Sequence, residues 1–326
     1  MNSLSIFTLK VFHKLYRKTF GDSQLSLLQR EENPDKISDI IYNYLIDEKP
    51  CMIARLGAFE LNIIINYIGV QQGRQSFLKY IKGEALKWWW DEQLIKFMNT
   101  NAGFFPPTQE KIKQFCELML KDAKEVDLLG SWQSNESYIY PNNNLIKVQL
   151  LFLEPFWSNN PWSRALQGKK VLVIHPFAET IKSQYQKREL LFKNQSILPT
   201  FKELFIIQAV QSLGGSNQFN DWFEALDYMK KEMDKIDYEI CLIGCGAYGF
   251  PLAAYAKRQG KKAIHLGGAL QLLFGIKGKR WEYPNFGEIT FNRKGAYLEL
   301  MNEYWCYPNE SETPKSSQQV EGGCYW

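Results

Sequence analysis

The chain has 326 residues, enough for one large domain or two smaller domains with well-filled cores. Its hydrophobic fraction of 45% excludes an intrinsically disordered protein. The net charge is only +4, and Lys and Arg are interleaved with Asp and Glu, so we expect no nucleic-acid partner.

Cysteine usage and hydrophobicity favour a cytoplasmic protein. The cysteines show no CxxC spacing and mostly lie within apolar runs, as reduced thiols do. No stretch is apolar over the length that a bilayer span requires. The N-terminus also lacks a small-residue cleavage site after an apolar block, so no secretory signal is expected.

Residues 1–32 are expected to form a basic amphipathic segment. Its first twenty residues contain no acid, and they place apolar side chains among basic ones: Ile6, Phe7, Val11, Phe12, Leu15 and Tyr16 among Lys10, Lys14, Arg17 and Lys18. A helix here can lie on an anionic membrane surface, which would put the protein at the inner face of the membrane. It can instead pack its apolar side on the domain and leave the basic side in water, which is the commoner use of such a stripe.

Between residues 33 and 307 helices and strands are expected to alternate. The expected strands are 51–54, 126–129, 148–153, 170–174, 238–243 and 262–266. The expected helices are 36–45, 58–68, 180–191, 201–213, 220–233 and one ending near 260, with 75–117 mostly helical apart from a break at 99–107. Gly214-Gly215 is expected to end the helix at 201–213. This alternation predicts an α/β domain with a Rossmann-like, doubly wound, mostly parallel sheet and helices on both faces.

Residues 308–326 are expected to form a C-terminal tail. The part at 308–319 is rich in Ser, Glu, Pro and Gln, which indicates an extended surface segment. The closing run Glu321-Gly322-Gly323-Cys324-Tyr325-Trp326 can either close over a site or pack as an apolar tail.

Four of the expected strands end in turns that carry Gly, His, Arg or an acid before a helix begins. These turns start at Arg55, His175, Gly244 and His265. Carboxyl ends of parallel strands share one edge of the sheet, where open α/β folds bind their ligands. We therefore expect one binding site built from these four turns.

The first turn, Arg55-Leu56-Gly57-Ala58-Phe59-Glu60, places Glu60 in the first turn of a helix. Gly57 permits the tight turn, and Arg55 has the fork of donors that orients a phosphate or a carboxylate. Glu60 can face the ligand edge, or it can simply interact with the dipole of its own helix. These two interpretations are equally supported by the residues.

The turn Gly244-Cys245-Gly246-Ala247-Tyr248-Gly249 fits GxGxxG between a strand and a helix. Backbone amides of Gly244, Gly246, Ala247 and Tyr248 could cradle a diphosphate at the helix N-terminus. The next strand ends in His265-Leu266-Gly267-Gly268 rather than in the acid that holds a dinucleotide ribose, which argues against NAD. The glycines can also serve only to make a close strand-to-helix turn.

Three further residues are candidates for binding the substrate. His175 and His265 each close a strand, where an imidazole can donate to phosphate or sugar hydroxyls or act as a base, or can simply be a hydrogen-bonded histidine at the margin of the core. Arg280, in a basic glycine-containing run, can add a phosphate contact or lie in a solvated loop.

The turn at Arg55 to Glu60 resembles the RxGxxE element, often written RFGDGE, of bacterial glycosyltransferases with the GT-D fold. The runs 244–253 and 262–268 are similar to that family's second conserved block, so the resemblance covers about residues 35–285. It implies a Rossmann-like fold and a nucleotide-sugar donor. It also implies an Asp-x-Glu pair in the first motif that is associated with the metal, Mn²⁺ or Mg²⁺, and with the nucleotide sugar, and Glu60 matches the acid of this pair. Ala58 stands where the family has an Asp, which puts the metal in doubt because one carboxylate anchors a divalent cation poorly.

We therefore expect a glycosyltransferase that moves a sugar from a nucleotide-diphosphate donor to a glycan or lipid-linked acceptor in surface polysaccharide biosynthesis. Glu60 is the catalytic candidate, as general base or as a metal ligand. Gly57, Arg55 and the other turn residues above are candidates for binding the substrate. Two alternatives stay open: a Rossmann-type NAD(P)-dependent oxidoreductase and a non-catalytic nucleotide-sugar-binding protein.

Overall fold

A computed structural model of the chain describes residues 3–21, 29–141, 145–212, 218–314 and 322–326. These residues form a seven-stranded sheet in which every pairing is parallel, with strand order β3-β2-β1-β7-β6-β4-β5. The strands are β1 (Cys51–Ala54), β2 (Leu128–Ser131), β3 (Ile146–Gln149), β4 (Lys170–His175), β5 (Glu203–Gln208), β6 (Ile240–Ile243) and β7 (Lys262–His265). The predicted α/β, doubly wound, Rossmann-like fold is confirmed.

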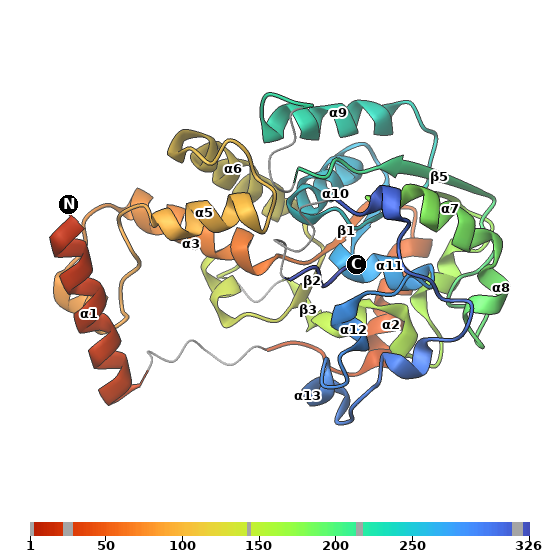
Figure 1. Ribbon diagram of the computed structural model, residues 1–326, viewed down its shortest axis with the longest axis horizontal. Helices are drawn as coiled ribbons and strands as arrows, with labels where there is room; N and C mark the ends of the chain where they lie inside the picture. The colour runs from red at the N-terminus through yellow and green to blue at the C-terminus, as the bar shows by residue number, and fades with distance from the viewer. Residues whose placement is uncertain (1–2, 22–28, 142–144, 213–217, 315–321) are drawn as a thin grey trace.

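Helices cover both faces of the sheet (Figure 1). One face packs against α3 (Ala58–Gln72), α5 (Glu92–Thr100), α6 (Gln109–Asp122), α9 (Trp222–Asp234) and α10 (Gly249–Arg258). The other packs against α2 (Pro34–Ile46), α7 (Ala178–Gln186), α8 (Arg188–Leu191), α11 (Leu270–Leu273) and α12 (Lys279–Glu282). Because both faces are covered, the central strands are runs of buried apolar residues rather than alternating ones.

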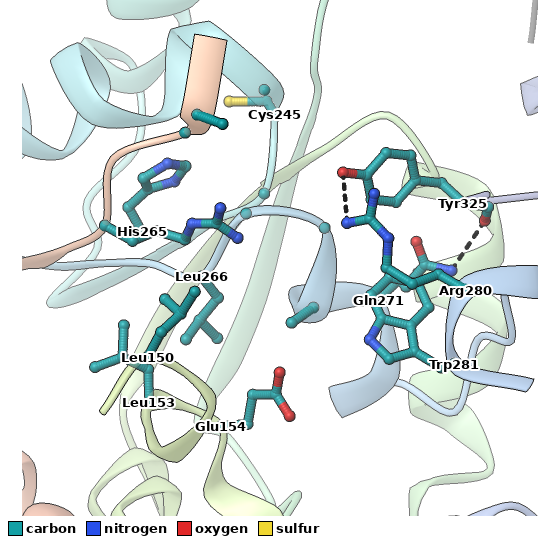
Figure 2. Close-up of a pocket in the computed structure, with 18 of the residues that line it drawn as sticks. Leu150, Leu153, Glu154, Cys245, His265, Leu266, Gln271, Arg280, Trp281 and Tyr325 are labelled. Carbon is teal, nitrogen blue, oxygen red and sulfur yellow. Dashed lines mark hydrogen bonds between the residues drawn. The ribbon is translucent and has the colours of Figure 1, made fainter. Parts of the chain in front are cut away.

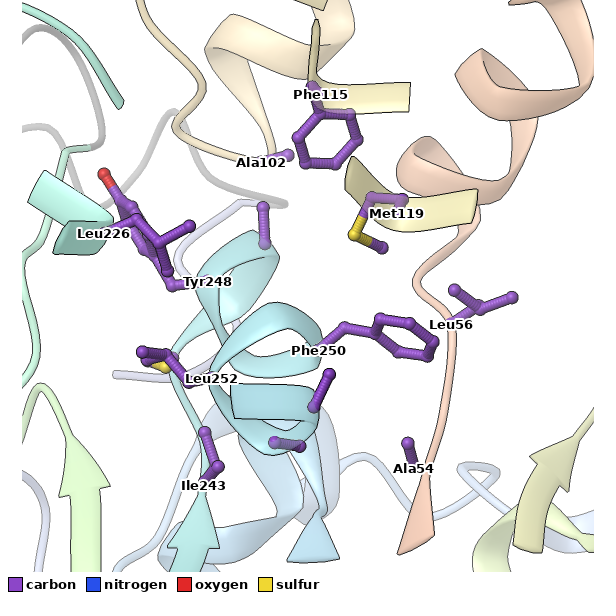
Figure 3. Packing of buried hydrophobic residues seen from close by; sticks show 14 of the residues in the cluster. Ala54, Leu56, Ala102, Phe115, Met119, Leu226, Ile243, Tyr248, Phe250 and Leu252 are labelled. Atoms are coloured by element: carbon purple, nitrogen blue, oxygen red, sulfur yellow. The ribbon is translucent and has the colours of Figure 1, made fainter. Parts of the chain in front are cut away.

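Helix α10 lies at the centre of the first layer. It has a small-residue face of alanines, which lets it pack close to β1 and β7. Its larger side chains point outward, and Figure 3 shows Phe250 directed toward Leu56 and Met119. The helix that follows the glycine turn is thereby fixed between the sheet and α6.

The connections that follow the neighbouring strands β4 and β6 lead to opposite faces of the sheet. Helix α7, which follows β4, packs on one face of the sheet, whereas α10, which follows β6, packs on the other. The two connections separate at the carboxyl ends of the strands, and this is the point at which open parallel sheets leave a crevice for a ligand.

Some expected elements were wrong. The expected helix at 201–213 is instead strand β5, which pairs along its whole length with β4. The expected strand at 148–153 ends at Gln149, and 150–153 is a 3₁₀ turn. Helix occupies less of 75–117 than expected, because the linker between α4 (Phe77–Ile81) and α5 is not helical. Gly214-Gly215 lies outside the described residues.

The two ends of the chain are partly as expected. The N-terminal segment forms α1 (Ser3–Phe20), which packs against α4. In the tail, 308–314 is not simply a surface segment, because Glu312 is buried and accepts hydrogen bonds from the backbone amides of Glu179 and Thr180 at the start of α7. Residues 315–319 lie outside the described residues.

Candidate functional site

A cavity of about 770 Å³ opens at the carboxyl edge of the sheet. Its wall includes ten of the eleven residues proposed from sequence: Arg55, Gly57, Glu60, His175, Gly244, Gly246, Tyr248, His265, Gly268 and Arg280. The eleventh, Ala247, is buried beside the cavity and does not line it. The cavity lies where the topology places a ligand site, and its volume is typical of pockets for small molecules and cofactors.

The glycine turn after β6 is constrained by packing. A Cβ on Gly244 would lie 2.6 Å from the carbonyl oxygen of Gly267 and 2.7 Å from Cδ2 of His175. Gly246 has φ of 56°, in the left-handed region that favours glycine. A Cβ on Gly249 would lie 2.2 Å from the ring of His265. Close approach therefore accounts for Gly244 and Gly249, and a left-handed backbone accounts for Gly246. Gly244 and Gly246 still line the cavity.

The two strand-closing histidines are buried and neutral. Burial lowers the pKa of each to about 3, and the Arg55 charge adds to the effect at His265. Nδ1 of His175 accepts from the backbone amide of Phe177 at 3.0 Å, so its proton is on Nε2. Nδ1 of His265 lies 3.4 Å from the carbonyl oxygen of Ile243 and therefore carries the proton. His175 can donate one hydrogen bond to a ligand, but neither ring supplies a positive charge.

Arg55 lies in the turn between β1 and α3, and Glu60 lies in the first turn of α3. Arg55 is half-buried, and its guanidinium lies over Trp132 at 5.8 Å. The Glu60 carboxylate folds back against Gly57, where an added Cβ would lie 2.0 Å from Oε2. A side chain at position 57 would therefore displace the end of the Glu60 side chain. The carboxylate can interact with the helix dipole and line the cavity at once, so both interpretations of Glu60 fit this geometry.

The acids around this turn do not fit a divalent metal. Within the described part of the chain, no group of three or more His, Cys, Asp or Glu side chains converges. Ala58 lines the cavity where the family has its Asp, so Glu60 is the only carboxylate of this motif. Mg²⁺ and Mn²⁺ prefer several oxygen ligands, and one carboxylate provides too few.

Glu154 is a cavity residue that sequence reasoning missed. It follows the 3₁₀ turn after β3 and is 6% exposed. Its Oε2 accepts from Nε1 of Trp157 at 2.9 Å and from the hydroxyl of Tyr297 at 2.7 Å. Burial raises the pKa of Glu154 to about 7, although these two hydrogen bonds and Arg55 act in the opposite direction. The only signal in the sequence was an acid within a long apolar run.

Gln271, the second residue of α11, is another cavity residue that the sequence did not indicate. Its Nε2 donates to the carbonyl oxygens of Lys277 at 2.7 Å and Tyr325 at 3.1 Å. The side chain is fully buried, and its Oε1 has no hydrogen-bond partner among the described residues. This acceptor is covered by the surrounding protein, although Gln271 belongs to the cavity wall.

The C-terminal residues line the same cavity. The Tyr325 ring lies 4.6 Å from the Arg280 guanidinium, and its hydroxyl accepts from Nη1 of Arg280 at 3.1 Å. A Cβ on Gly268 would lie 2.2 Å from this ring. Figure 2 shows Glu154 and Gln271 facing a hollow with His265 on one side and Arg280 and Tyr325 on the other. Of the two alternatives for the final segment, the structure thus places Tyr325 and Trp326 in the cavity wall.

Tyr248 has a role in packing that its place in the glycine motif did not indicate. Its ring stacks on Trp222 at 4.8 Å, and its hydroxyl lies 2.8 Å from Oγ of Ser212. The side chain is 2% exposed, so it presents little surface to a ligand.

The fold and cavity define a Rossmann-like α/β protein with a cavity at its topological switch point. Comparison of the chain with protein-family models, with curated proteins and with solved structures gave no match. All six cysteines are free thiols. No helix within the described ranges is long and apolar enough to cross a membrane.

Proposed function

We propose that the chain is a cytoplasmic glycosyltransferase that moves a sugar from a nucleotide-diphosphate donor to a glycan or lipid-linked acceptor. The observation that carries this proposal is the cavity itself, which joins the buried Glu154 carboxyl to Arg55 and Arg280 at the switch point of the sheet. The motif resemblance at 55–60 and 244–268 adds support. Synthesis of surface polysaccharide is the setting that this resemblance suggests.

The cavity offers the groups that a displacement at a sugar carbon needs. The acceptor oxygen forms a bond to the anomeric carbon, the bond from that carbon to the diphosphate oxygen breaks, and the nucleoside diphosphate leaves. Arg55 and Arg280 would stabilise the charge on the leaving diphosphate. Arg280 must exchange its contact with Tyr325 for this role. His175 can add a neutral donor from Nε2.

Glu154 is the best general base for the acceptor hydroxyl. A base is most effective when its pKa is near the working pH, and burial places the pKa of Glu154 at about 7. Glu60, the candidate from sequence, lies in the same wall, where it can position the donor. The proposed reaction uses no metal ion, because the described acids that line the cavity do not form a site for a divalent cation.

A dinucleotide fits the site less well. Strand β7 ends in His265, whose ring is buried against Gly249, and no carboxylate stands there to hold a ribose. Tight NAD(P)H binding would favour the oxidoreductase instead.

The test is release of nucleoside diphosphate from a panel of nucleotide sugars, with candidate glycan acceptors and with or without Mn²⁺. Wild type is compared with Glu154→Gln, Glu60→Gln and Glu110→Gln. Glu110 is the matched control for Glu60, because it is exposed and also lies in the first turn of a helix, α6.

We expect one donor to be turned over, with Glu154→Gln lowering kcat by about 10²- to 10⁴-fold, the usual contribution of a general base. Glu110→Gln should act as wild type does. Binding of a nucleotide sugar in calorimetry without turnover would select the non-catalytic binding protein. Binding of none would refute the nucleotide-sugar proposal.

A further inference from the structure

Helix α1 carries two apolar stripes on opposite sides. The inner stripe contains Ile6 and Leu9, which form a small cluster with Tyr80 and Trp89. His13 continues this side: its Nδ1 lies 2.8 Å from the carbonyl oxygen of Tyr80, and its ring stacks on that of Tyr80. This side of the helix is therefore already covered by α4 and by Trp89, which lies in the linker between α4 and α5.

The outer stripe consists of Leu4, Phe7, Val11 and Leu15. These positions are spaced three, four and four residues apart, so they fall on one face of the helix. Their exposed fractions are 74%, 66%, 39% and 54%. Packing on the domain thus explains the inner stripe of α1 and leaves the outer stripe uncovered. Single exposed apolar side chains need no explanation, but a contiguous exposed stripe indicates an interaction surface.

The same helix is basic throughout. Lys10, Lys14, Arg17 and Lys18 are exposed, and the helix has no acid in its first turn or anywhere along its length. On a helical projection Lys10, Lys14 and Arg17 lie along one flank of the outer stripe, and Lys18 falls within it. Apolar side chains beside a row of cations are the composition of helices that lie in the plane of an anionic bilayer surface.

Helix α4, which packs against α1, has the same character. Phe77 is 42% exposed and Leu78 is 69% exposed. Lys79 and Lys82 are exposed, and the run 73–83 contains no acid. This pair of helices lies at one end of the molecule, beyond α3 and away from the sheet (Figure 1).

We infer that the outer face of α1 docks on an anionic lipid membrane. Charge complementarity selects this occupant over a second copy of the chain, because pairing two such faces would bring like charges together. The helix would lie flat, with its apolar stripe at the headgroup boundary and its cations against lipid phosphates. The inference goes beyond the transferase proposal and does not depend on it.

The test is co-sedimentation of the full chain with vesicles of phosphatidylcholine alone or mixed with phosphatidylglycerol. The apolar variant is Phe7→Ser with Leu15→Ser, and the charge variant is Lys14→Gln with Lys18→Gln. The control is Ile46→Ser at the end of α2, where the side chain is 55% exposed, much like Leu15. None of these positions belongs to the inner stripe, and circular dichroism checks that each variant folds.

Wild type and the Ile46 control should bind the anionic vesicles and not the neutral ones. Each lysine removed should lower the partition coefficient about fivefold, so the charge variant should lose about 25-fold. The apolar variant should lose at least as much. Failure of wild type to bind anionic vesicles overturns the inference. So does unchanged binding by both double variants, or a wild-type dimer in solution that the apolar variant dissociates.

Discussion

Replacing Glu154 by Gln should change how the stability of the protein depends on pH. The amide has the size of the protonated acid, and its oxygen can keep both hydrogen bonds that Trp157 and Tyr297 donate. The substitution therefore removes ionisation at this position while preserving packing. Any pH effect that disappears in the variant belongs to this one carboxyl.

The sign follows from the direction of the pKa change. Burial raises the pKa from 4.5 to about 7, so the folded protein holds this proton more tightly than the unfolded chain. The stabilisation is fully present below the unfolded pKa and is lost as the pH rises through the folded pKa. At about 1.4 kcal/mol per pH unit, the whole difference is about 3 kcal/mol, of which about 2.5 kcal/mol falls between pH 5 and 8.

The assay is urea unfolding of both proteins at several pH values across that window. The free energy of unfolding of wild type should fall toward pH 8 relative to that of Glu154→Gln by about 2.5 kcal/mol. Parallel pH curves for the two proteins would mean that Glu154 ionises at its ordinary pKa. Glu154 would then also not be tuned as a general base near neutral pH.

Three other substitutions test the packing and the chemistry around the cavity. Gly249→Ala should destabilise the fold by about 1–3 kcal/mol in urea unfolding, because its Cβ would lie 2.2 Å from the buried His265 ring; unchanged stability would contradict this packing. Trp132→Ala should raise KM for the donor about tenfold with little change in kcat if this half-exposed ring stacks on the nucleotide, whereas an equal fall in kcat would point to another role. Tyr325→Ala should strengthen nucleoside-diphosphate binding in calorimetry, because it removes the hydrogen bond and ring contact that Tyr325 makes with Arg280; weaker binding would show that the ring itself holds the ligand.

Local signals in the sequence were enough to predict the fold class and to select residues that line one cavity. Apolar runs such as 170–174 are long enough for buried strands, and four of them end at turns that contain Gly, His or Arg. The rule that carboxyl ends of parallel strands share an edge then brought Arg55, His175, Gly244 and His265 to one cavity. Glycines of the turn at 244–249 were recognisable because their spacing reflects a local backbone requirement.

Strand pairing, burial and contacts across the cavity depend on residues that are distant in the sequence, so they became visible only in the tertiary structure. Residues 203–208 form strand β5 because β4 offers them an edge, although the run has apolar positions at helical spacing too. Glu154 becomes unusual because Tyr297, 143 residues away, helps to bury it and donates to it. Tyr325 reaches Arg280 across 45 residues. Burial, the pKa values that it changes and contacts across the cavity arise from packing between segments, and no local pattern in the chain encodes them.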